Sequence, residues 1–233
     1  MAEEILWTGR TKSGKEFVVR KYQPQDRART RWICSETGFI GKPQEAVFIG
    51  REVFADLWSK YWTDYEPENA LVAEVEGQVE GYLLGCLDSA RQEKIWNKEI
   101  LPGVARRLLL PSWWKHQKNR KFIRAWVRSN RLGEFKVPKD ELFKTHPAHL
   151  HTNIGDPAFR GQGLGKALML VYFDHLRRHN LSGLHLGTTD HNREAIPFYH
   201  YMGFKVLHKN RLTLYDHAID DPPMYLLYLG KYL

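Results

Sequence analysis

A glycine-rich stretch between an apolar segment and an amphipathic one has the clearest chemistry in this sequence. It runs from Asp156 to Ala167 and contains Gly161, Gly163 and Gly165. Glycines let a backbone approach a ligand closely, and the free N–H groups at a helix start favour an anion such as a pyrophosphate. The stretch therefore predicts a phosphate-binding loop.

Two familiar phosphate-binding motifs do not fit this stretch. A Walker A loop requires G-x4-G-K-[ST], whereas here Arg160 occupies the first glycine position and Ala167 the last position. A dinucleotide fingerprint requires G-x-G-x-x-G, whereas the three glycines here are spaced two by two. An ordinary strand-to-helix turn is the other alternative. We do not favour it, because three alternating glycines at a helix start are a destabilising way to build one.

The pattern that does fit is R-x-x-G-x-G, filled by Arg160, Gly163 and Gly165. A second block, with Asn192 and the run FYHYMGF at residues 198–204, matches N-x-x-A-x-x-[FL]-Y-x-x-x-G-F. The two blocks lie about one strand–helix unit apart. Together they resemble the GNAT acetyltransferase superfamily, in which the first block binds the pyrophosphate of acetyl-CoA. The resemblance implies an acetyl-CoA-dependent N-acetyltransferase.

A closer resemblance extends over nearly the whole chain. The segments PAHLH at residues 147–151 and LHLG at residues 184–187 are similar to bacterial proteins related to the C-terminal acetyltransferase-like domain of O-GlcNAcase. That branch commonly has Asp where this chain has Asn153. The acceptor does not follow from this resemblance.

The resemblance also assigns residues to acetyl-CoA. It places Asn153, Ile154 and Gly155 beside the thioester, where a backbone N–H would hold the acetyl carbonyl and stabilise the developing oxyanion. Asn192 would contact the pantetheine arm, or else cap the short helix that follows it. The pyrophosphate would lie in a cradle of seven consecutive residues: Arg160, Gly161, Gln162, Gly163, Leu164, Gly165 and Lys166.

Direct acetyl transfer requires two proton movements, because the amine must lose a proton and the departing thiolate must gain one. Tyr199 stands at the position of the family's usual general acid, next to the expected acetyl-CoA site. Phe198 and Phe204 flank it, so the alternative is a structural role as a core aromatic. Tyr201 and Tyr228 are further candidate donors.

The general base is less clearly indicated. Several GNAT branches carry a Glu five residues before the Asn, and this chain has Gly187 there. The ionisable alternatives are His149, His151 and His185, whose ordinary pKa suits proton transfer near neutral pH. Strand alternation predicts that His149 and His151 share a face, but each could equally be structural, and ordered water could replace them. The run from His146 to His151 contains three histidines but no Cys or carboxylate to complete a set of ligands, so we expect no metal site.

Periodicity and turn signals predict the elements that position these residues. We expect one α/β domain over residues 1–233, with the GNAT acyltransferase fold that the resemblance implies: a mixed, mostly antiparallel central sheet with helices on both faces. After an N-terminal hairpin at about 4–21, the expected strands are 71–76, 79–87, 148–155, 184–188, 204–208 and 224–232. The expected helices are 24–38, 44–62, 163–179 and 192–202.

A basic segment at about 89–147 separates the third and fourth core strands, and we expect a helical insertion broken at Pro102-Gly103 and at Pro111. It holds fifteen Lys+Arg against five Asp+Glu, a net of +10, which leaves −2 for the rest of a chain of net charge +8. Four of the eight Trp also lie in it. Basic and aromatic residues together could form a nucleic-acid surface. We expect amphipathic helices with inward Trp side chains instead, because no nucleic-acid-binding motif accompanies the charge.

Composition excludes other classes of protein. A hydrophobic fraction of 42% with 13% aromatics supports a packed core and excludes wholesale disorder. No apolar run approaches the roughly 20 residues of a membrane-spanning helix, and the acidic residues 1–4 do not resemble a signal sequence. Cys34 and Cys86 cannot form a disulfide framework. We therefore expect a cytoplasmic protein without a membrane partner, in which Trp113-Trp114 could form a homodimer interface.

Two functions remain open. One is an N-acetyltransferase that works by direct transfer in a ternary complex, which the intact loop and Tyr199 favour. The other is a catalytically weak or inactive module that binds acetyl-CoA or CoA, which Gly187 favours. The predicted cradle lies outside the basic segment, so we expect that charge to concern the acceptor or a partner. A neutral or acidic amine is then a better acceptor than a polycation.

Overall fold

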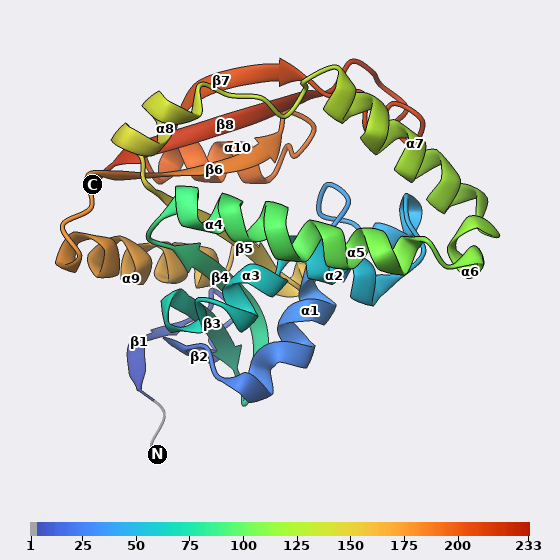
Figure 1. The fold of residues 1–233 in the computed structure, drawn as a ribbon. Helices are drawn as coiled ribbons and strands as arrows, with labels where there is room; N and C mark the ends of the chain where they lie inside the picture. The colour runs from blue at the N-terminus through green and yellow to red at the C-terminus, as the bar shows by residue number, and fades with distance from the viewer. Residues whose placement is uncertain (1–3) are drawn as a thin grey trace.

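A computed structural model describes residues 4–233 of the protein. Its centre is an eight-stranded sheet with the strand order β1-β2-β3-β4-β5-β6-β8-β7 (Figure 1). The strands are β1 (Ile5–Arg10), β2 (Glu16–Lys21), β3 (Ala70–Val75), β4 (Gln78–Cys86), β5 (Ala148–Ile154), β6 (Gly183–Thr189), β7 (Lys205–Arg211) and β8 (Tyr225–Tyr232). The predicted strands are all present, and the predicted N-terminal hairpin is β1–β2.

The sheet is antiparallel except at its centre. β4 pairs antiparallel with β5, and β6 pairs antiparallel with β8. Between them, β5 and β6 run parallel and pair only at Ala148↔Leu184 and His149↔His185. Beyond these two pairs the strands part. The expected mixed, mostly antiparallel sheet is thus confirmed, and its one parallel contact is short.

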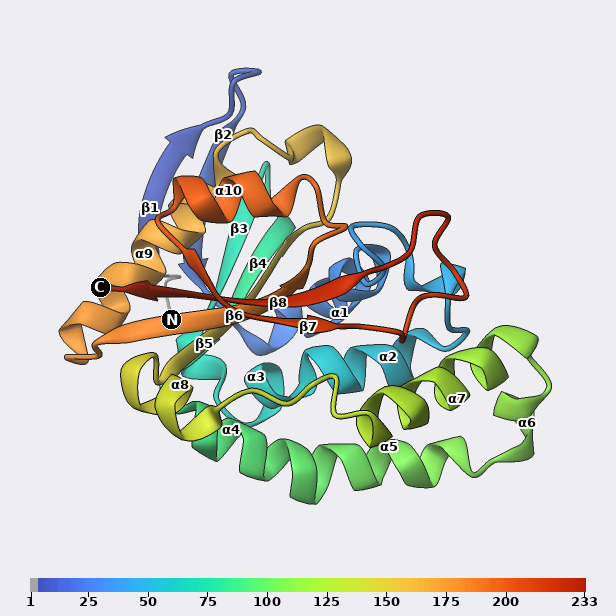
Figure 2. The same cartoon turned by 90° about the horizontal axis from the view of Figure 1, so that it is seen from above.

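Helices cover both faces of the sheet, as expected (Figures 1 and 2). On one face, α9 (Leu164–Arg178) buries Leu168 and Tyr172 in a core that also contains Leu83 and Leu150 of the sheet. α10 (Ala195–Tyr201) contributes to the same core. On the other face, a second core contains α1 (Arg27–Glu36), α2 (Arg51–Trp58) and α3 (Lys60–Asp64).

The single helix predicted over 44–62 is wrong. A 3-10 turn (Gln44–Ala46), α2 and α3 replace it, with breaks at Gly50 and Ser59. Gly50 has φ +142°, and the Trp113 ring occupies the space that a side chain at this position would need. The break thus depends on a contact from far along the chain, which local periodicity does not contain.

A helical segment lies between β4 and β5. It comprises α4 (Ser89–Ile95), a π-helical turn (Trp96–Ile100), α5 (Leu101–Leu108), α6 (Pro111–Trp114), α7 (Gln117–Arg131) and α8 (Lys139–Thr145). The predicted break at Pro102-Gly103 is wrong, because the helical run continues from Ser89 to Leu108. The π-helical turn directly precedes Pro102, and a wider turn of this kind accommodates a residue that cannot donate a backbone hydrogen bond. The predicted break at Pro111 is confirmed.

The inner side of α6 and α7 packs on loops of the main body. Trp113 stacks on Phe48 with ring centroids 6.0 Å apart, and Phe122 contacts Phe48 at 5.3 Å. The Asn119 amide donates to the carbonyl of Ile49 and accepts from its N–H. Trp113 therefore faces inward, whereas Trp114 is 41% exposed, so the two do not form one outward-facing pair.

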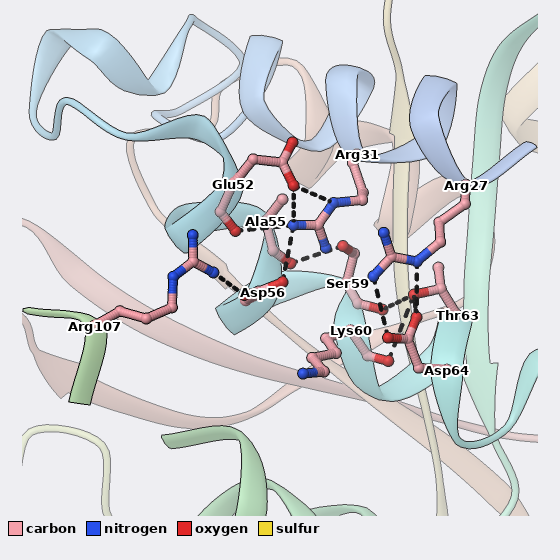
Figure 3. A network of polar contacts seen from close by, with 10 residues as sticks. All are labelled: Arg27, Arg31, Glu52, Ala55, Asp56, Ser59, Lys60, Thr63, Asp64 and Arg107. Carbon is pink, nitrogen blue, oxygen red and sulfur yellow. Dashed lines mark hydrogen bonds and ion pairs between the residues drawn. The ribbon is translucent and has the colours of Figure 1, made fainter. Parts of the chain in front are cut away.

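Ion pairs join the helices on the α1–α3 face, as Figure 3 shows. The buried Arg31 of α1 donates to the Glu52 carboxylate at 2.6 Å and to Asp56 at 2.8 Å, both on α2. Arg107 of α5 reaches the other oxygen of Asp56 at 2.5 Å. Asp56 thus links α1, α2 and the helical segment. Within residues 4–233, no helix is long and apolar enough to cross a membrane.

Candidate active site

The glycine-rich loop leads from β5 into α9. The Asp156 carboxylate accepts a hydrogen bond from the N–H of Ala158 at 2.8 Å and fixes the start of the loop. Gly161 and Gly163 have φ values of +69° and +102°, and a Cβ on either would meet no atom within 4 Å. The backbone requires glycine at both positions. The space beside them is open, which fits a loop that receives a ligand.

The start of α9 offers unsatisfied backbone donors to that space. The hydrogen bond from the N–H of Ala167 to the carbonyl of Gly163 closes the first helical turn. Gly163 is the N-cap and has no side chain to accept from the turn. The N–H groups of the first turn, at residues 164–166, are therefore left for solvent or an anion.

Side chains of the loop hold it against neighbouring elements. Arg160 donates to the carbonyl of Gly41 at 3.0 Å and lies 3.5 Å from the Glu194 carboxylate. The Gln162 side chain accepts from the N–H of Lys12 in the β1–β2 turn at 2.9 Å. These contacts anchor the loop to residues far away in sequence. Two of the predicted cradle side chains are thus already engaged with protein groups.

Lys166 lies at the exposed side of the same loop. Its ammonium group donates to the Tyr201 hydroxyl at 2.9 Å and sits 5.2 Å from the centre of that ring. Tyr201 is 68% exposed. The contact thus joins the first turn of α9 to the end of α10.

The parting of β5 and β6 exposes one edge of the β5 backbone. The N–H of Gly155 donates to the carbonyl of Glu80 on the β4 side at 2.8 Å, so it is not free. In an antiparallel ladder, successive residues direct their N–H groups to opposite sides. The N–H of Asn153 then also faces β4, and that of Ile154 faces the gap. Of the three residues predicted to lie beside a thioester, Ile154 has the available donor.

A polar cluster joins β4 and β5 on the face toward α1–α3. The Asn153 amide donates to the Tyr82 hydroxyl at 2.7 Å and lies 3.2 Å from Nε2 of His151. Nδ1 of His151 lies 3.4 Å from the Tyr82 hydroxyl. Trp62 of α3 packs over this strand, with its ring 5.6 Å from that of His149 and 6.1 Å from that of His151. The predicted shared face of His149 and His151 is confirmed.

These groups are electrically neutral near pH 7. Burial lowers the pKa of His151 to about 4 and lowers the pKa of His149 well below its usual value. Burial also raises the pKa of the Tyr82 hydroxyl well above its ordinary value. A general base works best with a pKa near the operating pH. The histidines therefore stay unprotonated but are weak bases.

Tyr199 of α10 is buried in the core on the α9 side of the sheet. The ring is buried between Phe198 and Phe204, with centroid distances of 5.6 and 5.8 Å. Burial raises the pKa of Tyr199 to about 12. The residue is therefore a core aromatic whose hydroxyl is protonated near neutral pH.

Other predicted residues lie elsewhere. The Tyr228 hydroxyl donates to the carbonyl of Phe135 at 3.1 Å and so turns toward the helical segment. His185 is buried on β6, where its Nδ1 lies 2.8 Å from the His146 carbonyl, and burial lowers its pKa to about 4. Asn192 does not cap α10 with its side chain, because Glu194 is the N-cap. Its amide lies 3.5 Å from the Thr188 hydroxyl, at the end of β6.

The sequence did not point to Tyr82 or Trp62. Tyr82 joins the cluster through the register Tyr82↔Asn153, and Trp62 through the packing of α3. A strand over 79–87 does place Tyr82 on the same face as Leu84 and Cys86. Which residue stands opposite is set by strand pairing, and no local signal reports it. Among residues 4–233, no group of three or more His, Cys, Asp or Glu is arranged to hold a metal ion.

Known proteins share this architecture. The crystal structure of SsHAT is 28% identical in sequence and superposes with a TM-score of 0.67, covering 93% of this chain and 98% of that one. The polyamine N-acetyltransferase of Drosophila melanogaster has the same fold at 15% identity, with a TM-score of 0.59 and coverage of 93% and 100%. So does yncA from Salmonella typhimurium, solved with its cofactor acetyl-CoA, at 14% identity, a TM-score of 0.51 and coverage of 93% and 94%.

The sequence itself carries a family match. Residues 34–204 match the acetyltransferase (GNAT) family over most of the chain, from the end of α1 to the start of β7. The matched region includes the glycine-rich loop, both parting strands and α10. The chain therefore belongs to the GNAT acetyltransferase family.

Proposed function

We propose that this protein is an acetyl-CoA-dependent N-acetyltransferase that moves an acetyl group to a primary amine by direct attack in a ternary complex. The observation that carries the proposal is the glycine loop at the start of α9. Its positive φ values and open space at Gly161 and Gly163 lie one short loop away from the parting of β5 and β6. Free N–H groups at a helix start suit a pyrophosphate. The other residues from Arg160 to Lys166 are assigned to the pyrophosphate cradle because they occupy the GNAT loop motif.

In this proposal the protein supplies one backbone hydrogen-bond donor to the carbonyl oxygen of the thioester and one general acid to its sulfur. The Ile154 N–H, directed into the gap between β5 and β6, stabilises the oxyanion that develops as the C–N bond forms. Tyr199 gives its proton to the sulfur as the C–S bond breaks. With a pKa of about 12, Tyr199 carries that proton at neutral pH. The proton of the amine leaves to water or to His151.

The cysteines support direct transfer over an acyl-enzyme. Cys34 and Cys86 are both unpaired and buried. Burial raises the pKa of each thiol to about 12, so neither is a thiolate near pH 7. A thiol is a poor nucleophile in that state. The amine is then the nucleophile that attacks the thioester.

The surroundings of the polar cluster favour an acceptor that is neutral or acidic. The side chains that contact His151 are those of Tyr82, Asn153 and Trp62, none of which carries a charge near pH 7. Among the described residues, these contacts offer no carboxylate to a substrate ammonium group. The +10 segment adds a repulsion for polycations.

A second candidate function is a module that binds acetyl-CoA or CoA without efficient chemistry. The specific support is the weak basicity of His149 and His151, together with Gly187 at the position where other branches carry Glu. The cofactor loop serves both functions equally. Only turnover separates them.

The finer assignments belong to the same proposal. Segments 147–151 and 184–187 favour the bacterial branch related to the O-GlcNAcase acetyltransferase-like domain. We treat residues 1–233 as one domain in which α4–α8 form an insertion. The two unpaired thiols favour a reducing compartment, the cytoplasm.

The test has two readouts. Release of CoA thiol from acetyl-CoA is followed with a panel of neutral, acidic and polycationic amines, and acceptor-dependent release is expected. Calorimetry compares acetyl-CoA binding by the wild type, by Gly163→Glu and by Gly133→Glu, a control at another positive-φ glycine. We expect at least a tenfold loss of affinity for Gly163→Glu alone. Binding without release for any amine favours the second function, and unchanged affinity refutes the loop assignment.

A further inference from the structure

Exposed apolar side chains gather on α6, on α7 and in the turns that flank them. Leu109, Leu110 and Leu132 are 77%, 56% and 60% exposed, and Trp114 and Val127 are 41% and 47% exposed. Beside them lies a hollow of about 550 Å³, lined by Trp114, Ile123, Arg124, Val127, Arg128, Arg131 and Leu132. We call these exposed and lining residues the α6–α7 surface. The Trp114 indole N–H donates to the carbonyl of Leu108 and thereby joins the Leu109–Leu110 turn to the hollow.

The α6–α7 surface is also strongly basic. Residues 101–133 contain nine Lys and Arg and no Asp or Glu. Within the described chain, Arg107 is the one of these nine that pairs with a carboxylate. Arg124, Arg128 and Arg131 line the hollow itself. The partner of this surface must therefore be anionic and must also offer apolar contact.

Three other kinds of partner, namely nucleic acid, a second copy of the chain and a docked helix, fit this surface less well. Nucleic acid satisfies the charge but would leave the apolar lining and Leu109–Leu110 in contact with water. A second copy in a two-fold contact would set the same arginines against each other. A docked helix needs a groove with two walls, whereas one helix and a single indole form this hollow.

We propose that the α6–α7 surface docks the protein onto an anionic lipid membrane. Leu109 and Leu110 enter the acyl boundary, and Trp114 lies at the level of the headgroups. Arg124, Arg128 and Arg131 pair with the negative headgroups. The contact is peripheral. The composition of the sequence argues against a membrane-spanning helix, but it does not exclude a surface that binds the membrane from one side.

The position of α6 in the molecule suits such a contact. In both views α6 lies at the far end of the helical segment, away from α9, α10 and the parting strands (Figures 1 and 2). Docking there leaves the glycine loop accessible from solvent. The inner side of α7 stays packed through Phe122 and Asn119, so the outer side is free to contact lipid without unfolding.

Vesicle flotation of the full chain tests the proposal. The vesicles are phosphatidylcholine alone, or phosphatidylcholine with about one third phosphatidylglycerol. We expect binding only to the anionic vesicles, and weaker binding as salt is raised because screening shortens the reach of the arginines. Arg124→Gln/Arg128→Gln/Arg131→Gln should lower the apparent affinity about a hundredfold, at roughly tenfold or less per arginine.

Apolar variants separate lipid from other anions. Leu109→Ser/Leu110→Ser should lose vesicle binding, whereas Val206→Ser/Leu207→Ser, at similarly exposed apolar residues of β7, should keep it. Unchanged acetyl-CoA binding and thermal unfolding verify that each variant is folded. The proposal would be overturned by equal binding to both vesicle types, by no binding to either, or by binding to a short RNA duplex that Leu109→Ser/Leu110→Ser leaves intact. A dimer abolished by Leu109→Ser/Leu110→Ser would also overturn it, in favour of a second copy.

Discussion

At the scale of single residues, burial without a charged partner sets the chemistry of the site. Tyr199 keeps its proton because its phenol is buried, and His151 stays neutral for the same reason. An ionised carboxylate nearby would raise the pKa of the imidazole and bind a substrate ammonium group. In the described chain no carboxylate contacts His151, so the proposal assigns proton transfer to the hydroxyl of Tyr199 rather than to an imidazole.

Replacing Tyr199 by Phe removes the proposed acid and little else. The ring keeps its contacts with Phe198 and Phe204, so we expect the fold and acetyl-CoA affinity to be retained. The turnover number should fall about a hundredfold, a typical contribution of general acid catalysis. Thiol release under saturating acceptor measures it. Tyr232→Phe, at an exposed tyrosine of β8, is the matched control, and equal rates in all three proteins would exclude Tyr199 as the acid.

How far the site could be predicted differs from residue to residue. Gly161 and Gly163 were predictable because a loop motif is contiguous and its backbone needs are local. The proposed oxyanion donor was predicted only as a range, Asn153 to Gly155, since the bond from Gly155 to Glu80 depends on the pairing of β4 with β5. Tyr82 escaped prediction for the same reason. Local chemistry is written in the sequence, whereas cross-strand partners depend on register.

At the scale of elements, β5 and β6 hold a neutral histidine pair, in which His185 is buried and His149 is half-buried. The rings of His149 and His185 lie 5.0 Å apart where the two strands meet. His185 has a folded-state pKa of about 4 against an ordinary value of 6.5. The unfolded chain therefore binds protons more readily than the folded one between these values. The contribution of neutral His185 to the free energy of unfolding is therefore fully present above pH 6.5, and it is lost as the pH falls toward 4.

The size of this acid destabilisation can be measured with a variant. For His185 alone, a shift from 6.5 to about 4 corresponds to about 3 kcal/mol of unfolding free energy. We expect His185→Gln to flatten the fall in stability between pH 6.5 and 4, measured by urea unfolding at each pH. His116→Gln, at an exposed histidine, should leave the slope unchanged. Identical slopes for His185→Gln and the wild type would contradict the prediction.

Asp56 is the point where three helices share one carboxylate. Asp56→Asn removes the charge that Arg31 and Arg107 both contact, and it leaves Arg31 buried with Glu52 alone (Figure 3). We expect a loss of about 2–3 kcal/mol in unfolding free energy. Denaturant midpoints at constant slope measure it. The exposed pair Arg10–Glu16 supplies the control, since Arg10→Gln should change little.

Element boundaries illustrate what sequence patterns omit. The apolar stripe of 44–62 predicts one helix, and the fold breaks it because Gly50 must lie against Trp113. Conversely, Pro102 signals a break, and the π-helical turn before it keeps the helix continuous. In both cases the strand–helix order was predictable, because it follows from patterns within each segment. The boundaries were not, because packing between segments decides them.

At the scale of the whole molecule, charge is divided between two parts of the chain. Residues 89–147 carry the excess of positive charge, whereas the loop that would bind phosphates uses backbone N–H groups with Arg160 and Lys166. The fold shared with a polyamine N-acetyltransferase at 15% identity does not transfer the acceptor. For the choice of acceptor, the positive charge of residues 89–147 gives a stronger argument than the shared fold, because it repels a polycation near the helical segment.

Matched acceptors of different charge test this division. We expect kcat/KM for a neutral or acidic primary amine to exceed that for spermidine by at least tenfold at low salt, because a field of one sign steers the approach of charged ligands. Raising the ionic strength should lower kcat/KM for the acidic amine and raise it for spermidine, since screening weakens the attraction of the first and the repulsion of the second. Thiol-release kinetics at two salt concentrations measure both effects. A preference for spermidine that falls with salt would show that acidic groups, rather than the basic helices, govern access to the site.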